Sequence, residues 1–413
     1  DGRRIAWPPP GSGNSPGGIT MFDVASKSVR TFATFKDRSV GALAWMPDGS
    51  GLLVLYQSPQ TEYRSQIGFL SYPGAKFSAI TRDTNSYPNF TISADDSTIA
   101  TIQQNTLSDL NLLPSSGNGE SSPSPVFSAR AQIFGFSWDG NDALLLGETG
   151  KLLRVSADGK TITTLINQPG SIFAGLSACP DGRLTFSWGL HGTNEINVWR
   201  ANADGSDPTQ LTQGKSDYGP VCSAGGEWVY YFDAASPAHP FRRVRLDGGR
   251  PQDVPGSIGP GIIASTRLSL SSDGKQVAYV AGVNSAVASQ SPTRIALVRL
   301  GSGRAPRLIV PDSRFAYGSN WSGSLGFSSN WAITLAFTPD GKALAYPIRQ
   351  NGGDNVWVQP LDGARGRQIT HFTSEGILKV LWSPDGKHLA VLRFRSNANI
   401  VLLRTPNPSA AAQ

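Results

Sequence analysis

The chain reads Thr338-Pro339-Asp340-Gly341-Lys342-Ala343-Leu344-Ala345-Tyr346, a tight turn that leads into a strand-like hydrophobic stretch. Proline presets φ in the turn, aspartate can bond its own backbone, and glycine accepts the left-handed conformation. A turn of this kind joins two antiparallel strands. Copies of it, some of them degenerate, recur at Asp1, Asp48, Asp95, Asp139, Asp181, Gly225, Asp273, Asp340 and Asp385.

Neighbouring copies of the turn lie 42 to 48 residues apart, except for one gap of 67 residues before Asp340. A fixed period in the forties that carries strand-like sequence predicts a β-propeller, in which each repeat forms one blade. In the last full repeat, two strands flank the turn at Asp340, and two more are expected at residues 355–361 and 367–370. Because a single blade cannot bury both its faces, its neighbours must cover them.

The sequence therefore predicts an all-β fold. We expect a single β-propeller of four-stranded antiparallel blades over residues 1–405 and a disordered tail at residues 406–413. Eight blades are favoured, with seven or nine as alternatives, because the expected strands outnumber those of eight blades and fall short of nine. The ring should close by pairing C-terminal strands with an N-terminal one, leaving an extra strand or two near Asp1. Helices should be nearly absent, since the 46 glycines and 29 prolines are costly in helices.

Charge and hydropathy argue against two classes of partner. The formal net charge is +6, but the basic residues are scattered around the repeats, so we expect no nucleic-acid binding. No apolar run reaches the roughly 18 residues of a membrane-spanning helix, so this segment should make no membrane contact. The densest basic group is interpreted as a solvated strand, with an anion-binding patch as the alternative: Arg242, Arg243, Arg245 and Arg250.

The two cysteines, Cys179 and Cys222, lie in neighbouring repeats. Aligned on the turn, they occupy positions one step apart. Because the side chains of a strand alternate between its faces, the two thiols should point in different directions. We therefore expect two separate buried thiols, with a disulfide as the alternative.

The long insertions indicate which face of the propeller binds a partner. Most fall on connections that share one face, at residues 8–17, 57–64, 233–239, 282–292 and 311–330. Loops on a rigid scaffold are where binding concentrates, so we expect a protein or a small ligand to bind this face. The best candidate is the insertion at 311–330, which carries Phe315, Tyr317, Trp321 and Phe327 among small polar residues. The alternative is that these aromatic residues pack over one blade as a small satellite core.

No residue set indicates catalysis, a metal or a cofactor. The stretch Gly13-Asn14-Ser15-Pro16-Gly17 fits a nucleophile pattern by letter, but it lies in a Pro/Gly-rich loop rather than between a strand and a helix. None of the four histidines is spaced as a metal pair. The turn aspartates occur singly in separate blades, whereas Ca²⁺ needs six to eight converging oxygen atoms. We expect a non-catalytic chain without catalytic residues, metal or cofactor.

The repeat resembles the TolB-type β-propeller repeat over nearly the whole chain. The resemblance rests on the Ser-Pro-Asp-Gly-Lys turn, the Leu-Ala-Tyr that follows it, and the later Trp-Val, Asp-Gly and Gln-Ile-Thr. Two turns depart from the pattern: Ser223-Ala224-Gly225-Gly226 lacks Pro-Asp, and Ser93-Ala94-Asp95-Asp96 lacks the glycine. Looser turns are expected there.

A more specific resemblance is to the extracytoplasmic region of bacterial membrane-anchored Ser/Thr protein kinases. It is carried by residues 45–53 (Trp-Met-Pro-Asp-Gly-Ser-Gly-Leu-Leu), 70–74 (Leu-Ser-Tyr-Pro-Gly), 80–87 (Ile-Thr-Arg-Asp-Thr-Asn-Ser-Tyr) and 382–403. It implies an extracytoplasmic sensor or scaffold, tethered by an upstream transmembrane helix, with the kinase domain outside this segment. The alternatives are the regulatory propeller of a serine peptidase and a free periplasmic TolB-like scaffold.

Overall fold

The fold, in a computed structural model, is built almost wholly of β-strands. The structure describes residues 2–8, 17–117, 123–130, 133–190, 195–236, 241–254, 268–281, 294–316 and 335–404. Within these ranges one short 3₁₀ helix, η1 (Pro59–Thr61), accompanies the strands. The all-β prediction is confirmed. The tail expected at 406–413 lies outside the described residues.

The chain divides into two compact units. Unit 1 comprises Asp1–Thr106, His191–Thr193 and Ser396–Gln413, and unit 2 comprises Leu107–Leu190 and Asn194–Arg395. Two long strands, β9 (Thr98–Pro114) and β30 (His388–Arg404), contribute residues to both units. That residues 1–405 form a single domain stays a prediction.

Unit 1 contains three small sheets. The first is β1 (Arg4–Trp7), β2 (Gly18–Asp23) and β3 (Ser28–Thr34), and the second is β4 (Ser39–Trp45), β5 (Gly51–Gln57), β6 (Gln66–Ser71) and β7 (Phe77–Ala79). In the third, β8 (Phe90–Ile92) pairs with the beginning of β9. Neighbouring sheets share buried apolar side chains: Ile19 and Leu52 belong to one cluster, and Leu53 and Ile99 to another.

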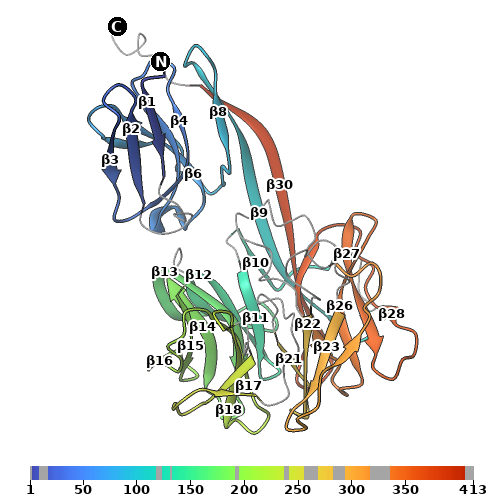
Figure 1. The fold of residues 1–413 in the computed structure, drawn as a ribbon. Helices are drawn as coiled ribbons and strands as arrows, with labels where there is room; N and C mark the ends of the chain where they lie inside the picture. The colour runs from blue at the N-terminus through green and yellow to red at the C-terminus, as the bar shows by residue number, and fades with distance from the viewer. Residues whose placement is uncertain are drawn as a thin grey trace. The chain divides into compact units, whose positions relative to one another are not determined.

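In unit 2 the C-terminal strands join a sheet that also contains a strand from much earlier in the chain. Its order is β10-β9-β30-β29, with β10 at Phe127–Ala129 and β29 at Gly376–Trp382. Figure 1 shows β9 and β30 as adjacent long strands. C-terminal closure was expected, but the partner is β9 rather than a strand near Asp1. Seven strands, β1 to β7, therefore lie in other sheets, not the one or two expected.

The next two repeats share one six-stranded sheet. Its strands follow chain order: β11 (Ile133–Asp139), β12 (Ala143–Ser156), β13 (Ile162–Ala178), β14 (Leu184–Leu190), β15 (Ile196–Ala201) and β16 (Thr209–Gln210). The long β12 and β13 each run through a point where the repeat pattern predicts a break between two strands. The number of blades, for which eight was favoured, stays a prediction.

Three four-stranded sheets follow, each antiparallel and in chain order, as the repeat predicts. Their strands are β17 (Asp217–Cys222), β18 (Trp228–Asp233), β19 (Phe241–Arg245) and β20 (Gln252–Asp253); β21 (Ser269–Leu270), β22 (Gln276–Ala281), β23 (Arg294–Arg299) and β24 (Arg307–Ile309); and β25 (Ala336–Phe337), β26 (Ala343–Gln350), β27 (Gly353–Pro360) and β28 (Arg367–Gln368).

The sheets of unit 2 pack face to face in a closed cycle. Apolar clusters join each sheet to the next, for example Phe232 with Tyr279 and Val356 with Val391. Strand β29 contacts β27 on one side and β11 on the other, which closes the cycle. Residues of β11, β13, β17, β21 and β29 line one hollow of about 130 Å³. Small antiparallel sheets packed around a shared axis form the β-propeller that the repeat predicts.

Side-chain hydrogen bonds explain the recurring turn. The Ser156 hydroxyl donates to Asp158 Oδ1 over 2.6 Å, and the backbone N–H of Lys160 donates to the same oxygen over 3.1 Å. The N–H of Thr161 donates to the Ser156 hydroxyl over 3.0 Å. The same network occurs at Ser271/Asp273, Thr338/Asp340 and Ser383/Asp385. The turn aspartates thus bond their own backbone, as the turn chemistry predicts.

Candidate functional site

The aromatic candidates of the long insertion are only partly within the described residues. Phe315 packs edge-on against Tyr346, with ring centroids 4.9 Å apart, and forms an isolated bridge with Ile348 of β26. Its ring thus joins the apolar cluster between two sheets of unit 2. Tyr317, Trp321 and Phe327 lie outside the described residues. The binding role of these four residues stays a prediction.

A polar pocket of about 420 Å³ lies in unit 2, beside the sheet β17–β20. Its wall includes the segment 211–214, which follows β16, together with Asp217 of β17, Tyr231 of β18, Arg242 of β19 and Arg250. This volume is within the range of small-ligand sites. The segment belongs to the class of connection that the sequence assigns to the binding face.

The local sequence holds this segment in place through one threonine and one asparagine. Thr212 follows the short β16, and its hydroxyl accepts the backbone N–H of Val198 over 3.0 Å. The Asn197 side chain donates to the carbonyl of Gly214 over 2.6 Å. The same threonine contact recurs in other repeats, at Thr81 with Ile67 and at Thr370 with Val356. This device fixes the path of the chain into β17.

Asp217, the first residue of β17, is the central group of the pocket. Its side chain is buried, with 1% relative exposure of the residue. Oδ2 accepts the backbone N–H of Gly214 over 3.1 Å and the Asn197 amide over 3.4 Å. Oδ1 is buried and has no hydrogen-bond partner within the described part of the chain. A β-carbon on residue 214 would lie 2.5 Å from both carboxylate oxygens, so only glycine fits there.

Burial raises the pKa of Asp217 above its ordinary value. The Thr212 hydroxyl opposes this shift, and the nearby Asp233 carboxylate adds to it. Burial and the charge of Asp217 likewise raise the pKa of Tyr231. A carboxylate that is out of water and incompletely hydrogen-bonded is costly, so its retention indicates a functional role.

The other two buried aspartates of the described chain are fully engaged. Asp354 accepts from Arg349 Nε over 2.8 Å with one oxygen and from the N–H of Ile377 over 3.0 Å with the other. Asp233 accepts from the N–H of Ala235 over 3.1 Å and from Arg242 over 3.4 Å. Asp217 differs from both because one of its oxygens is left open at a pocket.

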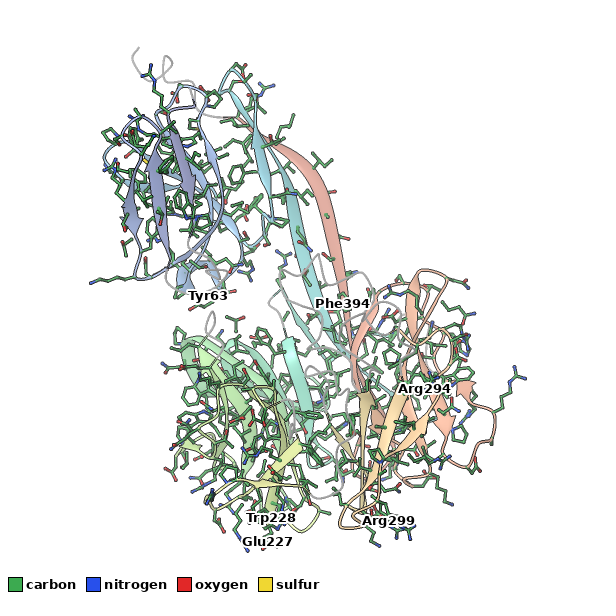
Figure 2. All side chains as sticks on the ribbon, viewed as in Figure 1. Tyr63, Glu227, Trp228, Arg294, Arg299 and Phe394 are labelled. Carbon is green, nitrogen blue, oxygen red and sulfur yellow. A yellow bond between two sulfur atoms is a disulfide. The ribbon has the colours of Figure 1, made fainter. Side chains whose placement is uncertain are left out.

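The arginine group singled out in the sequence divides into surface contacts and pocket residues. Arg243 and Arg245 lie over the Trp228 ring, 4.1 and 4.9 Å from its centroid. Arg245 also pairs with Glu227 over 2.6 Å, and Figure 2 shows Glu227 and Trp228 together at one end of the sheet. These contacts agree with the interpretation of a solvated strand for Arg243 and Arg245.

Arg242 and Arg250 belong to the pocket instead. Arg242 lies between two carboxylates, 3.4 Å from Asp233 and 3.2 Å from Asp253, so its charge is compensated. Arg250 is exposed and lines the pocket. Within the described ranges it forms no ion pair.

The axial hollow of unit 2 is the second candidate. Lys379 of β29 is buried there at 8% exposure, and its ammonium donates to the carbonyl of Phe136 and lies 5.3 Å from the Phe136 ring centroid. Because the hollow is small and its lysine already has these partners, the pocket at Asp217 is the stronger candidate. Among the described residues, no group of His, Cys, Asp and Glu is arranged to hold a metal.

The structure corrects the expectation of two separate thiols: Cys179 and Cys222 form a disulfide, with Cα atoms 5.3 Å apart. This separation is within the range that a disulfide requires. The sequence argument assumed unbroken alternation of side chains. Both strands instead contain a register shift, between Ala174 and Ser177 in β13 and between Tyr218 and Val221 in β17. A bulge of this kind changes the face to which later side chains point.

Comparison with known proteins finds neither a matching family nor a matching curated protein. Among solved structures, the chain is similar to TolB from Acinetobacter baumannii, with 11% identity, coverage of 96% of this chain and 82% of that one, and a TM-score of 0.39. It is similar to an oligogalacturonate lyase from Vibrio parahaemolyticus, with 10% identity, 88% coverage of each chain and a TM-score of 0.38. It is also similar to a puromycin-hydrolyzing peptidase from Mycobacterium tuberculosis, with 11% identity, coverage of 89% of this chain and 51% of that one, and a TM-score of 0.39.

Proposed function

We propose that this chain is a non-catalytic binding domain whose pocket at Asp217 receives a ligand. The observation that carries the proposal is the buried Asp217 carboxylate, which has one oxygen open at a pocket of about 420 Å³. A bound donor would satisfy that oxygen. The pocket is polar, and its carboxylate stands without a nucleophile–base pair, which favours binding over chemistry.

The test is a thermal-shift screen of the purified chain against amines, amino acids, sugars, peptides and nucleosides. A ligand that binds only the folded state raises the melting temperature with its concentration. The proposal expects at least one class to stabilise the wild type and to lose this effect in Asp217→Asn. Glu375→Gln, which changes an equally placed acid in another sheet, should keep it. Failure of every class, or equal stabilisation of Asp217→Asn, would contradict the proposal.

We further propose that the domain works outside the cytoplasm, as the sensor or scaffold part of a bacterial membrane-anchored Ser/Thr protein kinase. The support is the resemblance at residues 45–53 and 80–87, together with the Cys179–Cys222 disulfide, since disulfides persist in oxidising compartments. Within the described residues, no helix is long and apolar enough to cross a membrane.

This context has its own test. The gene that encodes this chain should also encode a kinase domain followed by one membrane-spanning helix. A ligand found in the screen should then change autophosphorylation of the full-length protein in membranes. A gene with a hydrolase domain in place of the kinase would contradict the kinase context and leave the binding pocket unaffected.

A further inference from the structure

Two sheets of unit 2 contain an acidic residue at the same repeat position. Asp217 lies five residues after Thr212, and Glu375 lies five residues after Thr370. Both threonines accept a backbone N–H from the neighbouring strand, from Val198 and Val356 respectively. The two acids therefore enter their sheets along the same path and can be compared directly.

Glu375 has cationic partners on the facing strand. Arg393 of β30 lies 2.9 Å from one of its oxygens, and Arg395 lies 3.8 Å from the other. The Glu375 side chain is 14% exposed. This acid is thus neutralised by guanidinium groups of the protein itself, as a largely buried charge requires.

The corresponding partners of Asp217 are not cations. The ladders pair Gly376 with Phe394 in one sheet and Tyr218 with Phe232 in the other. Counting from these pairs, Tyr231 stands where Arg393 stands, and Asp233 stands where Arg395 stands. Both positions have lost their positive charge, and the second has become acidic. The pocket lies beside this substituted position.

No other group of the described chain replaces the missing cation. The side chains that act on the Asp217 carboxyl are the neutral Thr212 and Asn197 and the acidic Asp233. The nearest lining guanidinium, Arg242, is compensated by Asp233 and Asp253. Arg250 is exposed, where solvent screens its charge. An acid that is neutralised in one sheet is left without a counter-charge in another, at a cavity.

We infer that the pocket binds an organic cation, a guanidinium or ammonium group, which takes the place of the guanidinium that Arg393 supplies to Glu375. This inference rests on the proposed binding function and names its ligand class. Such a group donates N–H to the open Oδ1 of Asp217 and brings the missing charge. The Tyr231 ring, which replaces Arg393, lines the space that the cation would occupy.

Calorimetric titration with methylguanidinium, methylammonium and the uncharged methylurea tests the inference. Methylurea resembles methylguanidinium in shape and lacks its charge. The cations should bind and methylurea should not. Asp217→Asn should weaken cation binding at least about tenfold, the size of effect expected for a charge-assisted hydrogen bond. Glu375→Gln, the matched control, should stay within about twofold of the wild type.

A second variant supplies the cation from the protein. Tyr231→Arg restores the arrangement of the Glu375 site, so it should abolish binding of methylguanidinium and leave the chain folded. N-acetyl-arginine amide, tested beside free methylguanidinium, distinguishes an arginine side chain of a partner protein from a small-molecule cation by which of the two binds more tightly.

Equal binding of methylurea and methylguanidinium would overturn the inference, as would unchanged cation affinity in Asp217→Asn. If the screen finds only neutral ligands that Asp217→Asn loses, the inference fails and the proposed binding function stands. If nothing binds, the proposed function itself fails.

Discussion

The backbone N–H of Asp385 donates a hydrogen bond to the Asn141 side chain over 3.0 Å, so the last repeat turn contacts the turn that follows β11. A similar contact joins two other turns of unit 2, where the Ser272 hydroxyl donates to the carbonyl of Pro339 over 2.9 Å. Neighbouring turns therefore contact one another around the ring. The contact at Asp385 belongs to the closure of unit 2, where β9 and β30 share a sheet.

Closure of the ring should make its apolar seam important for stability. Leu110 of β9 is fully buried in the cluster that also holds Leu392 of β30 and Phe136 of β11. Leu110→Ala should lower the free energy of unfolding by about 2–5 kcal/mol, as for other buried leucines. The same substitution at Leu308, which is 56% exposed, should change it by less than about 0.5 kcal/mol. Urea unfolding measures both, and equal effects of the two substitutions would contradict a buried seam.

The turn aspartates should make the protein sensitive to acid. The Ser156 hydroxyl and the N–H of Lys160 lower the pKa of Asp158 to about 2, and Ser93 and Ser97 do the same for Asp95. Because these values are depressed only in the folded state, the stabilisation is complete above about pH 4 and is lost as the pH falls towards 2. Urea midpoints between pH 5 and 2 should therefore fall less steeply for Asp158→Asn than for the wild type. A variant with the wild-type slope would show that this carboxylate has no part in acid unfolding.

The disulfide should stabilise the folded chain measurably. Cys179 and Cys222 are separated by 43 residues, and closing such a loop restricts the unfolded chain. Replacing both cysteines by serine should cost about 2–4 kcal/mol in unfolding free energy. Thiol labelling followed by mass spectrometry provides the control, because the wild type should take up label only after reduction. Labelling of the folded, unreduced protein would contradict the disulfide.

The aromatic residues of the long insertion should separate into two classes. Phe315→Ala should lower stability by about 1–2 kcal/mol, since its half-buried ring packs on Tyr346. Alanine at Tyr317, Trp321 and Phe327 should leave the melting temperature nearly unchanged and weaken binding of a partner at the loop face. Lost stability with unchanged binding in this second group would favour the satellite core over a recognition loop.

Much of the fold could be predicted because the turn at Asp340 and its copies are local chemistry. The Ser-Pro-Asp-Gly pattern encodes its own hydrogen bonds, and a fixed period indicates stacked repeats. The merging of strands in β12 and β13 was not predictable, because it depends on long-range pairs such as Thr149 with Ile172. The Cys179–Cys222 pair was missed for the same reason, since bulges changed the alternation of side chains.

The pocket was missed although part of its signal is visible in the sequence. An acid five residues after the threonine occurs at both Asp217 and Glu375. What distinguishes the two acids is the residue on the facing strand, Tyr231 in one sheet and Arg393 in the other. That difference becomes apparent only once the register of each ladder is known.

The most direct test of the account is the stability of Asp217→Asn measured beside its ligand binding. Burial raises the pKa of Asp217 in the folded state, so the stability of the wild type should fall as the pH rises from about 4 through that raised value. The variant lacks this loss. At pH 7 it should be as stable as the wild type or more stable by about 1 kcal/mol, while binding of the cation is lost. Asp354→Asn, which weakens a buried pair with Arg349, should be destabilised by about 1–3 kcal/mol. An Asp217→Asn protein that is destabilised like Asp354→Asn and still binds its ligand would contradict the account.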